Sequence, residues 1–325
     1  MKNTIISATA SYLPENEVLN EQLTQFPADS RPRIAEKTGV LARRIAPEHS
    51  CTSDLAIEAG LKCLEKAKFP PEKVQGVVLS TSSPDCVQPP TAARAQAGLG
   101  VPQAFAFDIN SVCSGSTFGI CMADALIRSG RFENILFIAA EMYSKILNPN
   151  DFGTTPYFGD GAGAILFEAG VGEKGVLHSC LGTDGHMSEE VGVFGGGTLN
   201  PYRRLPNPNS IYLKMNGRAI KEFALKRGCE IIRRLAGETG IDLSDVDCFI
   251  CHQANVNILK ELAAGLNVSF EKFFVNLDRY GNTASASVVI ALDEAIEAGM
   301  IGEGSLVATV AFGGGLSYGA NLIRF

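Results

Sequence analysis

The sequence predicts an α/β protein built from two similar halves, each a parallel-rich sheet covered by helices. Three observations support this prediction. Of the 325 residues, 46% are hydrophobic and only 19% are charged, so the chain can bury a large core. The 34 glycines indicate many tight turns between strands and helices. Apolar strands alternate with helical patterns, which is the order expected for parallel strands with helices on the faces of the sheet.

Charge and cysteine content narrow the classes of function. The chain carries 28 basic and 35 acidic side chains, a net charge of −7, whereas nucleic-acid-binding proteins usually have a basic excess. Nine cysteines lie singly along the chain, which is typical of a reduced protein in which one thiol can be reactive. No apolar run reaches the length of a membrane helix, and the N-terminal MKNTIISATASYL resembles a first strand rather than an export signal. We therefore expect a soluble, cytoplasmic protein with neither a nucleic-acid nor a membrane partner.

The elements follow one another in a repeated order. Residues 104–142 read as an apolar strand, a turn of small residues, a helix ending near Gly130 and a second strand at 134–141. Residues 273–312 repeat this order, with a helix ending near Gly299 and a second strand at 305–312. Setting Gly130 on Gly299, an offset of 169, places Cys113 on Asn282, each at the start of the central helix of its half.

A second match supports a duplication. The strand at 74–82 corresponds to 246–254 at an offset of 172, and glycine-rich turns at 158–164 and 312–315 close the two halves. We expect two similar layers about a pseudo-dyad, residues 1–172 and 173–325, divided near Gly170–Gly175. Such a dyad brings equivalent helix N-termini towards a shared axis, so residues near 113, 252 and 282 are expected to converge.

Cys113 is the candidate nucleophile. It follows the strand Ala104–Ile109 and opens a helix, where the positive end of the helix dipole favours a thiolate. The small residues that follow it, Ser114, Gly115 and Ser116, leave room for a substrate. The alternative is a buried structural cysteine, an interpretation that suits Cys121, Cys229 and Cys248.

His252 and Asn282 are the candidate partners of Cys113. His252 ends the strand Val246–Cys251, and strand ends beside small-residue loops are where α/β sites usually form. The alternative for His252 is a hydrogen-bonded surface histidine, and the alternative for Asn282 is an ordinary helix N-cap. Together the three side chains form a coherent set, in which cysteine carries an acyl thioester while histidine and asparagine donate hydrogen bonds to developing negative charge.

Two motifs and several cofactors are rejected. Cys248-Phe-Ile-Cys-His252 has the letters of a haem attachment site, but the two cysteines lie in one apolar strand and point to opposite faces. Gly315-Leu-Ser-Tyr-Gly319 spells a hydrolase nucleophile elbow, yet no helix and no histidine follow, so it is a turn into the last strand. The glycine-rich turns do not open a dinucleotide-binding unit. We expect no nicotinamide, flavin or metal, because ligand spacing is lacking among the carboxylates and the four histidines, His49, His178, His186 and His252.

The sequence resembles the thiolase-fold condensing enzymes, and within them β-ketoacyl-ACP synthase III, over essentially its whole length. The resemblance lies in five motifs in family order: the Cys113 turn, Phe158-Gly-Asp-Gly-Ala-Gly-Ala164, His252-Gln-Ala-Asn255, Gly281-Asn-Thr-Ala-Ser285 and Ala311-Phe-Gly-Gly-Gly315. It implies the five-layered αβαβα thiolase-like fold, in line with the two pseudo-symmetric halves above. It also implies a homodimer.

The same resemblance implies roles for single residues. Cys113 would be acylated, and His252 and Asn282 would bind the thioester carbonyl of malonyl-ACP and stabilise its enolate. The backbone N–H groups of Cys113 and Gly314 would form the oxyanion hole, and Asn255 and Phe312 would contact the substrate. The substrates would be an acyl-CoA or another acyl thioester and malonyl-acyl carrier protein (ACP), with no bound cofactor.

Two features depart from the family pattern. Typical members hold the CoA adenine between a Trp and an Arg, whereas the matching positions here are Arg33 and Phe152, so the cation and the aromatic ring have changed places. A basic helix around 214–239 would dock an acidic carrier protein through Lys214, Arg218 and Lys221, which share a face at i, i+4 and i+7 spacing. The alternative for these three cations is an ordinary solvated helix face.

The expected activity is a decarboxylating Claisen condensation that yields a 3-oxoacyl-ACP, in fatty acid initiation or a related specialised pathway. The loop 193–202 resembles that of relatives that handle longer or unusual acyl groups in secondary metabolism. Alternatives are an enzyme that only transfers acyl groups or condenses β-keto acids, a non-catalytic acyl-binding partner subunit, and a cysteine hydrolase.

Overall fold

The protein consists of two mixed β-sheets with helices outside and between them. The computed structural model describes residues 3–325. The first sheet has the order β1-β7-β6-β4-β5, with bounds Asn3–Tyr12, Asp160–Gly170, Asn134–Met142, Gly76–Ser80 and Phe105–Ile109. The second has the order β11-β12-β13-β8, with bounds Cys248–Cys251, Leu306–Gly313, Ser317–Arg324 and Gly175–Thr183. Every strand of the first sheet precedes residue 172, and every strand of the second follows residue 173.

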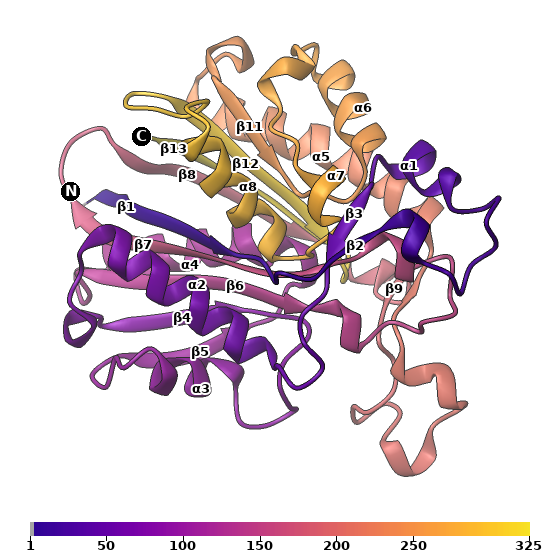
Figure 1. Cartoon of the computed structure of the whole chain (residues 1–325). Coiled ribbons are helices and arrows are strands. Elements are labelled where there is room, and N and C mark those ends of the chain that lie inside the picture. The colour runs from indigo at the N-terminus through magenta and orange to yellow at the C-terminus, as the bar shows by residue number, and fades with distance from the viewer. Residues whose placement is uncertain (1–2) are drawn as a thin grey trace.

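Helices form the other three layers (Figure 1). α2 (Thr52–Ala67) and α3 (Thr91–Gly98) cover the outer face of the first sheet, and α5 (Gly217–Thr239) and α6 (Val256–Leu266) cover that of the second. Between the sheets lie α4 (Gly115–Arg128) and α8 (Ala286–Glu297), whose apolar residues pack against both sheets. Three buried clusters, one on each side of the two sheets and one between them, make up the main core. The predicted αβαβα layering is confirmed.

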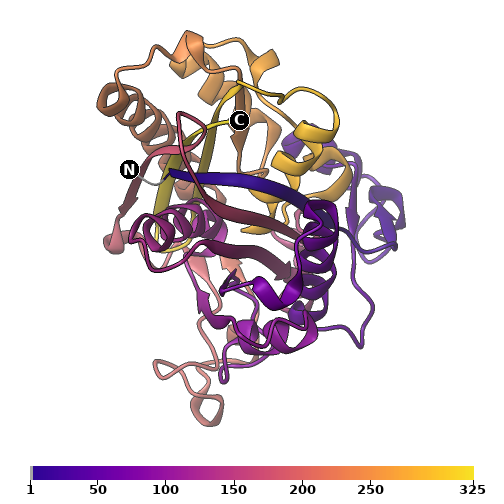
Figure 2. The same ribbon diagram turned by 90° about the vertical axis from the view of Figure 1, so that its left-hand side faces the viewer.

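Short elements surround one end of this core. They are β2 (Glu17–Leu19), β3 (Ala42–Arg44), α1 (Pro32–Thr38), α7 (Leu277–Tyr280), β9 (Val191–Gly192) and β10 (Lys214–Met215). The chain between β9 and β10 protrudes from the body of the protein, as Figures 1 and 2 show from two directions. In the described residues 3–325, no helix is both long enough and apolar enough to cross a membrane.

The prediction of parallel-rich sheets is only partly right. β4 pairs in parallel with β5 and β6, and β11 with β12. The other pairs are antiparallel. β12 leads directly into β13 through the turn Gly314–Leu316, which is too short for a crossover. Each sheet is therefore parallel at one end and antiparallel at the other.

The strand register corrects the predicted pairing of Cys113 with Asn282. Val77 pairs with Leu136, and Phe249 pairs with Ala308, so both strands repeat at an offset of 172. The positive φ of Val112 (47°) and of Ala284 (45°) repeats at the same offset. On this register Cys113 corresponds to Ser285, and Asn282 lies three residues earlier. The offset of 169 aligns only the helix ends, since α8 has 12 residues and α4 has 14.

The two rejected motifs lie where the sequence places them. Cys248 packs in the core between the sheets and Cys251 in the core on the opposite face of the second sheet. Gly315 and Leu316 form the turn between β12 and β13.

Candidate active site

Cys113, His252 and Asn282 line one cavity of about 60 Å³ where the two halves meet. They come from the turn before α4, the end of β11 and the turn before α8. Phe312 and Gly314, at the end of β12, line the same cavity. Apolar side chains complete the wall: Val112, Tyr143, Phe158, Val191, Leu213, Met215, Ile220, Ala254 and Ile258. The convergence expected from the duplication is thus present in the structure.

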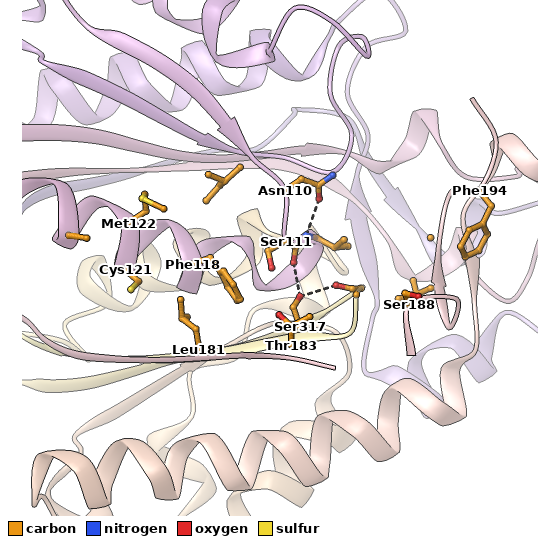
Figure 3. Close-up of a pocket in the computed structure, with 17 residues that line it drawn as sticks. Asn110, Ser111, Phe118, Cys121, Met122, Leu181, Thr183, Ser188, Phe194 and Ser317 are labelled. Atoms are coloured by element: carbon orange, nitrogen blue, oxygen red, sulfur yellow. Dashed lines mark hydrogen bonds between the residues drawn. The ribbon is translucent and has the colours of Figure 1, made fainter. Parts of the chain in front are cut away.

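The turn that carries Cys113 is held by the second half. Cys113 sits in a single 3-10 turn, Val112–Ser114, between β5 and α4. The hydroxyls of Ser114 and Ser317 lie 2.7 Å apart. Ser317 Oγ also lies 3.2 Å from the Ser111 carbonyl (Figure 3). Gly313 approaches so closely that a Cβ there would lie 2.6 Å from the Cys113 nitrogen, so β12 leaves no room for any side chain at this position.

Burial dominates the electrostatics of the nucleophile. It raises the pKa of the Cys113 thiol to about 12, and the nearby Glu141 carboxylate adds to the rise. The Cys113 backbone N–H and the Tyr143 hydroxyl act in the opposite direction by hydrogen bonding to the sulfur. The expectation that the helix N-terminus favours a thiolate is therefore corrected: desolvation outweighs it, and the resting group is a neutral thiol.

His252 is buried and neutral. Its Nδ1 lies 2.7 Å from the Ser287 hydroxyl, and its ring meets the edge of Phe312 at a centroid distance of 5.7 Å and an angle of 77°. Burial lowers the pKa of His252 to about 4, which the Ala284 carbonyl beside the ring offsets only in part. Ser287 Oγ also accepts the Gln253 N–H at 3.3 Å. A hydroxyl both donates and accepts, so it can pair with Nδ1 in either tautomer; in the tautomer with the proton on Nε2, the Ser287 hydroxyl is the donor.

Asn282 is locked by its backbone, while its amide group stays available. Its N–H donates to the Tyr157 carbonyl at 2.8 Å, and its carbonyl accepts the Gly159 N–H at 3.1 Å. Its Oδ1 accepts the Ala284 N–H at 2.8 Å. Within residues 3–325 its Nδ2 has no hydrogen-bond partner, and the side chain borders the cavity. It therefore offers an N–H donor to a bound molecule.

Sequence reasoning missed a buried polar group behind Cys113. Glu141, at the end of β6, is fully buried, and burial raises its pKa. It accepts hydrogen bonds from Ser82, from the Ser83 hydroxyl at 2.6 Å and, across the two halves, from the Ser285 hydroxyl at 2.7 Å. Tyr143 joins this group through Ser82. The sequence does contain one indication of this group, because Glu141 is an acidic residue in the largely apolar strand 134–142.

Three predicted substrate residues lie outside this cavity. Asn255 caps α6: its Oδ1 accepts the Asn257 N–H, and its Nδ2 donates to the Lys37 carbonyl at 3.0 Å. Arg33 is exposed on α1. Phe152 packs edge-on against Phe26, at a centroid distance of 5.2 Å, rather than against a cation.

The predicted carrier-docking helix begins later than expected. α5 starts at Gly217 because Asn216 caps it by accepting the Ala219 N–H. Lys214 therefore lies in β10 and does not share a helix face with Arg218 and Lys221, which corrects the i, i+4, i+7 argument. Lys221 pairs with Glu261 at 2.8 Å, whereas Lys214 and Arg218 are exposed and form no ion pair within residues 3–325.

One group of potential metal ligands forms that the sequence spacing did not indicate. The ligand atoms of His178, Cys180 and Glu238 lie within 4.8 Å of one another, although these residues come from β8 and α5. Arg234 donates to the other oxygen of Glu238 at 2.7 Å. The four side chains lie outside the Cys113 cavity and form an ion-paired surface cluster.

Comparison with known proteins agrees with this geometry. Residues 107–185 match the family described as 3-oxoacyl-acyl-carrier-protein (ACP) synthase III, and residues 237–325 match the C-terminal part of that family. A β-ketoacyl-ACP synthase III from Clostridium acetobutylicum is 34% identical over 100% of this chain and 99% of its own length. One from Caldanaerobacter subterraneus is 38% identical over 98% of this chain and 97% of its own. The crystal structure of the Aquifex aeolicus 3-oxoacyl-ACP synthase III covers 99% of this chain and 100% of its own, with a TM-score of 0.91 and 35% identity.

Proposed function

The chain belongs to the 3-oxoacyl-ACP synthase III family, and we propose that it condenses an acyl group carried on Cys113 with malonyl-ACP. The product is a 3-oxoacyl-ACP, the starting unit of fatty acid synthesis. The observation that carries this proposal is the meeting of Cys113, His252 and Asn282 at one small cavity. Residues 1–172 supply the nucleophile and residues 173–325 the two hydrogen-bond donors.

In the first half-reaction, Cys113 Sγ attacks the carbonyl carbon of an acyl thioester. The bond to the donor sulfur breaks, and the Cys113 proton leaves with the released thiol, so one thioester is exchanged for another. Negative charge develops on the carbonyl oxygen during the attack. The backbone N–H of Gly314 has no acceptor within residues 3–325, and together with that of Cys113 it supplies the oxyanion hole.

In the second half-reaction, malonyl-ACP loses CO₂ and leaves an enolate. Nε2–H of His252 and Nδ2–H of Asn282 donate hydrogen bonds to the enolate oxygen. The neutral imidazole suits this role, since it gives a donor without requiring a buried charge. The enolate carbon then attacks the acyl carbonyl, the bond to Cys113 Sγ breaks, and the departing thiolate takes up a proton.

The carrier protein docks beside the mouth of the cavity. Ile220 of α5 and Ile258 of α6 line the cavity, and the exposed cations Lys214 and Arg218 lie within a few residues of Ile220. These cations attract the acidic carrier. Lys221 contributes less, because Glu261 neutralises it. The exchange of cation and aromatic ring at Arg33 and Phe152 favours an acyl donor other than CoA, and Phe26 occupies part of the Phe152 surface through an edge contact.

The active unit is a homodimer formed at the edge of the first sheet. β5 is an edge strand whose side chains are half-buried and, apart from Asp108, apolar. Next to it lies a groove of about 660 Å³ lined by Phe118, Met122, Leu181 and Phe194 (Figure 3). An unpaired edge beside an apolar groove is a surface that a second copy can cover.

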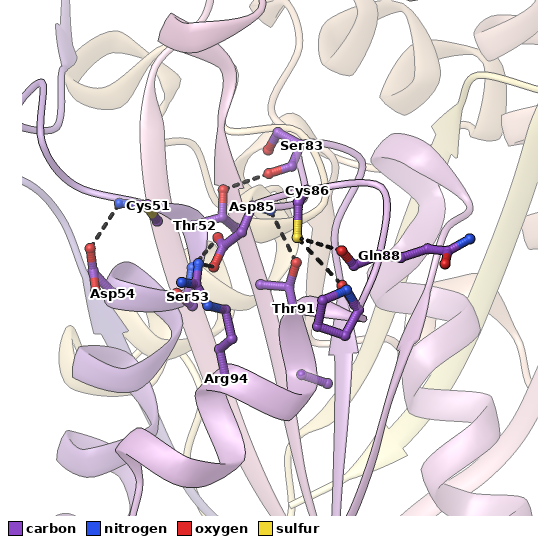
Figure 4. Close-up of polar contacts among 12 residues, drawn as sticks. Cys51, Thr52, Ser53, Asp54, Ser83, Asp85, Cys86, Gln88, Thr91 and Arg94 are labelled. Carbon is purple, nitrogen blue, oxygen red and sulfur yellow. Dashed lines mark hydrogen bonds and ion pairs between the residues drawn. The ribbon is translucent and has the colours of Figure 1, made fainter. Parts of the chain in front are cut away.

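A rigid loop flanks this surface. Asp85 accepts the Ser53 N–H at 2.9 Å and pairs with Arg94 at 3.0 Å, while the Cys86 thiol donates to the Gln88 carbonyl (Figure 4). The loop holds Val87 with 78% of its surface exposed. A second copy is the occupant that would bury this side chain. The nine cysteines are all free thiols, which supports a cytoplasmic location.

A role in a specialised pathway is the second candidate. The priming β-ketosynthase of the R1128 polyketide pathway has a TM-score of 0.91 and 26% identity, and covers 100% of this chain and 96% of its own. The long connection between β9 and β10 and the altered Arg33/Phe152 pair favour this candidate. An assay of turnover with different carrier proteins tests this role. Turnover with the carrier protein of a specialised pathway, and none with the carrier protein of fatty acid synthesis, would establish it.

The deciding experiment separates the two half-reactions. Incubation with acetyl-CoA or acetyl-ACP should add one acetyl group to the protein, as read by intact mass, and Cys113→Ala should abolish the addition. His252→Ala and Asn282→Ala should still be acylated but should release CO₂ from labelled malonyl-ACP at least 100-fold more slowly, in line with the loss of a transition-state donor. Acylation of Cys113→Ala would contradict the proposal, and release of free acid without malonyl-ACP would indicate a hydrolase.

A further inference from the structure

Tyr143 forms a fixed wall of the cavity that holds Cys113. It follows β6 in a single 3-10 turn and is only 2% exposed. Its ring stacks on Phe158 at a centroid distance of 4.9 Å and an angle of 12°. These two rings, with Leu213 and its neighbours, make a small apolar cluster that packs against Cys113 and is separate from the three main cores.

The hydroxyl of Tyr143 anchors the ring at its other end. It lies 2.9 Å from Ser82 Oγ, with either oxygen able to donate, and the Ser82 backbone N–H donates to the Glu141 carboxylate at 3.1 Å. Glu141 is itself held by Ser83 and Ser285. Rotating the ring out of the cavity would break a buried hydrogen bond and a ring stack together, so the wall does not yield easily.

The space left beside the nucleophile is small. A cavity of about 60 Å³ holds roughly four groups of the size of a water molecule. The larger groove next to it is separated from Cys113 by Val112, Val191 and Gly314, which line both spaces. A long acyl chain on Cys113 would have to displace Tyr143 or break through this partition.

We propose that Tyr143 determines the acyl specificity of the enzyme: its ring restricts Cys113 to short acyl groups of about two to four carbons. This inference rests on the proposed function, since it assumes that Cys113 is acylated. It assigns the discrimination to one side chain, because Tyr143 is the largest residue that lines the cavity and is fixed at both ends.

The test is a chain-length series of acyl thioesters, from acetyl to octanoyl, with acylation of Cys113 followed by intact mass. In the unaltered protein we expect the rate to fall by about 10- to 100-fold between butyryl and octanoyl, the range by which tight apolar pockets discriminate between chain lengths. Tyr143→Ala and the milder Tyr143→Leu should raise the octanoyl-to-acetyl ratio by at least about tenfold.

Tyr143→Phe is the matched control, because it keeps the ring and removes only the hydroxyl. Its octanoyl-to-acetyl ratio should stay below that of Tyr143→Leu, because the ring keeps its volume and its stack on Phe158. Equal labelling of the unaltered protein by octanoyl and acetyl donors would overturn this inference, as would an unchanged ratio in folded Tyr143→Leu. Absence of labelling by every donor would instead overturn the proposed function, so the two failures are distinguishable.

Discussion

At the scale of single residues, burial controls the ionisation of the two titratable groups in the site. Burial holds the pKa of His252 near 4, compared with an ordinary value of 6.5. The imidazole therefore stays neutral over the whole physiological range. The Cys113 thiol is shifted in the other direction, so neither group carries charge at rest. This leaves the enolate as the new charge that the site must stabilise.

The pKa of His252 leads to a prediction for the decarboxylation half-reaction. Its rate at low malonyl-ACP concentration should stay flat from pH 8 down to about pH 5, because the imidazole does not change its protonation state in this range. The rate of CO₂ release, measured with circular dichroism at each pH to confirm folding, tests this. A midpoint near pH 6.5 would contradict the structure.

The same shift makes the fold sensitive to acid. Between about pH 6.5 and pH 4 the unfolded chain binds a proton at this histidine while the native protein does not. The free energy of unfolding therefore decreases as the pH is lowered through this window. His252→Gln should lack this part of the pH dependence. Comparing the two proteins isolates the histidine from Glu141 and Asp160, whose pKa values burial raises.

The sequence indicated the residues at strand and helix ends but not those behind them. Cys113 and His252 stand at positions where apolar strands stop, so the pattern alone places them on one side of a sheet. Glu141 and Tyr143 act through contacts with Ser82 and, across the halves, with Ser285. Such partners are set by the packing of the two sheets, and no local spacing encodes them.

At the scale of elements, the start of α5 decides which cations can meet a carrier protein. The Asn216 cap was the local signal for that start. It separates Lys214, on β10, from Arg218, on the first turn of the helix. The two exposed cations thus reach the cavity mouth from two different elements.

Reversing these two charges should weaken the use of the carrier protein. We expect Lys214→Glu combined with Arg218→Glu to raise the KM for malonyl-ACP by about tenfold at low salt and by less at high salt. Exposed charges at the edge of an interface mainly change the rate of association, and salt screens them. Acylation from a small thioester should be unchanged. Arg131→Glu is the control, since Arg131 is exposed beyond the far end of α4. An equal rise in that control would show that net charge, and not this surface, matters.

At the scale of the whole molecule, duplication explains both what the sequence predicted and where it was wrong. The repeat of strand, turn and helix led to five layers, which the structure has. The ungapped offset of 169 misaligned the two central helices, because α8 is two residues shorter than α4. Strand register, which depends on hydrogen bonds between strands distant in the chain, is needed to place Cys113 on Ser285.

The groove beside β5 leads to a prediction about assembly. Met122→Glu should convert the dimer to a monomer, because it places a charge on a 42% exposed side chain that lines the groove. Leu61→Glu, on α2 and 40% exposed, is the matched control and should stay dimeric. Light scattering after gel filtration measures both. A Met122→Glu protein of unchanged mass, or an unaltered protein that is monomeric, would refute the proposed interface.

Because β12 and β13 hold the Cys113 turn in place, the enzyme becomes reactive only after these strands have been synthesised and have folded. Gly313 and Ser317, which hold this turn, follow Cys113 in the sequence and therefore leave the ribosome after it. A nascent chain that has already exposed Cys113 still lacks His252, the Gly314 N–H and the wall that encloses the thiol. Acylation by the complete site therefore has to wait until β13 has packed against the Cys113 turn.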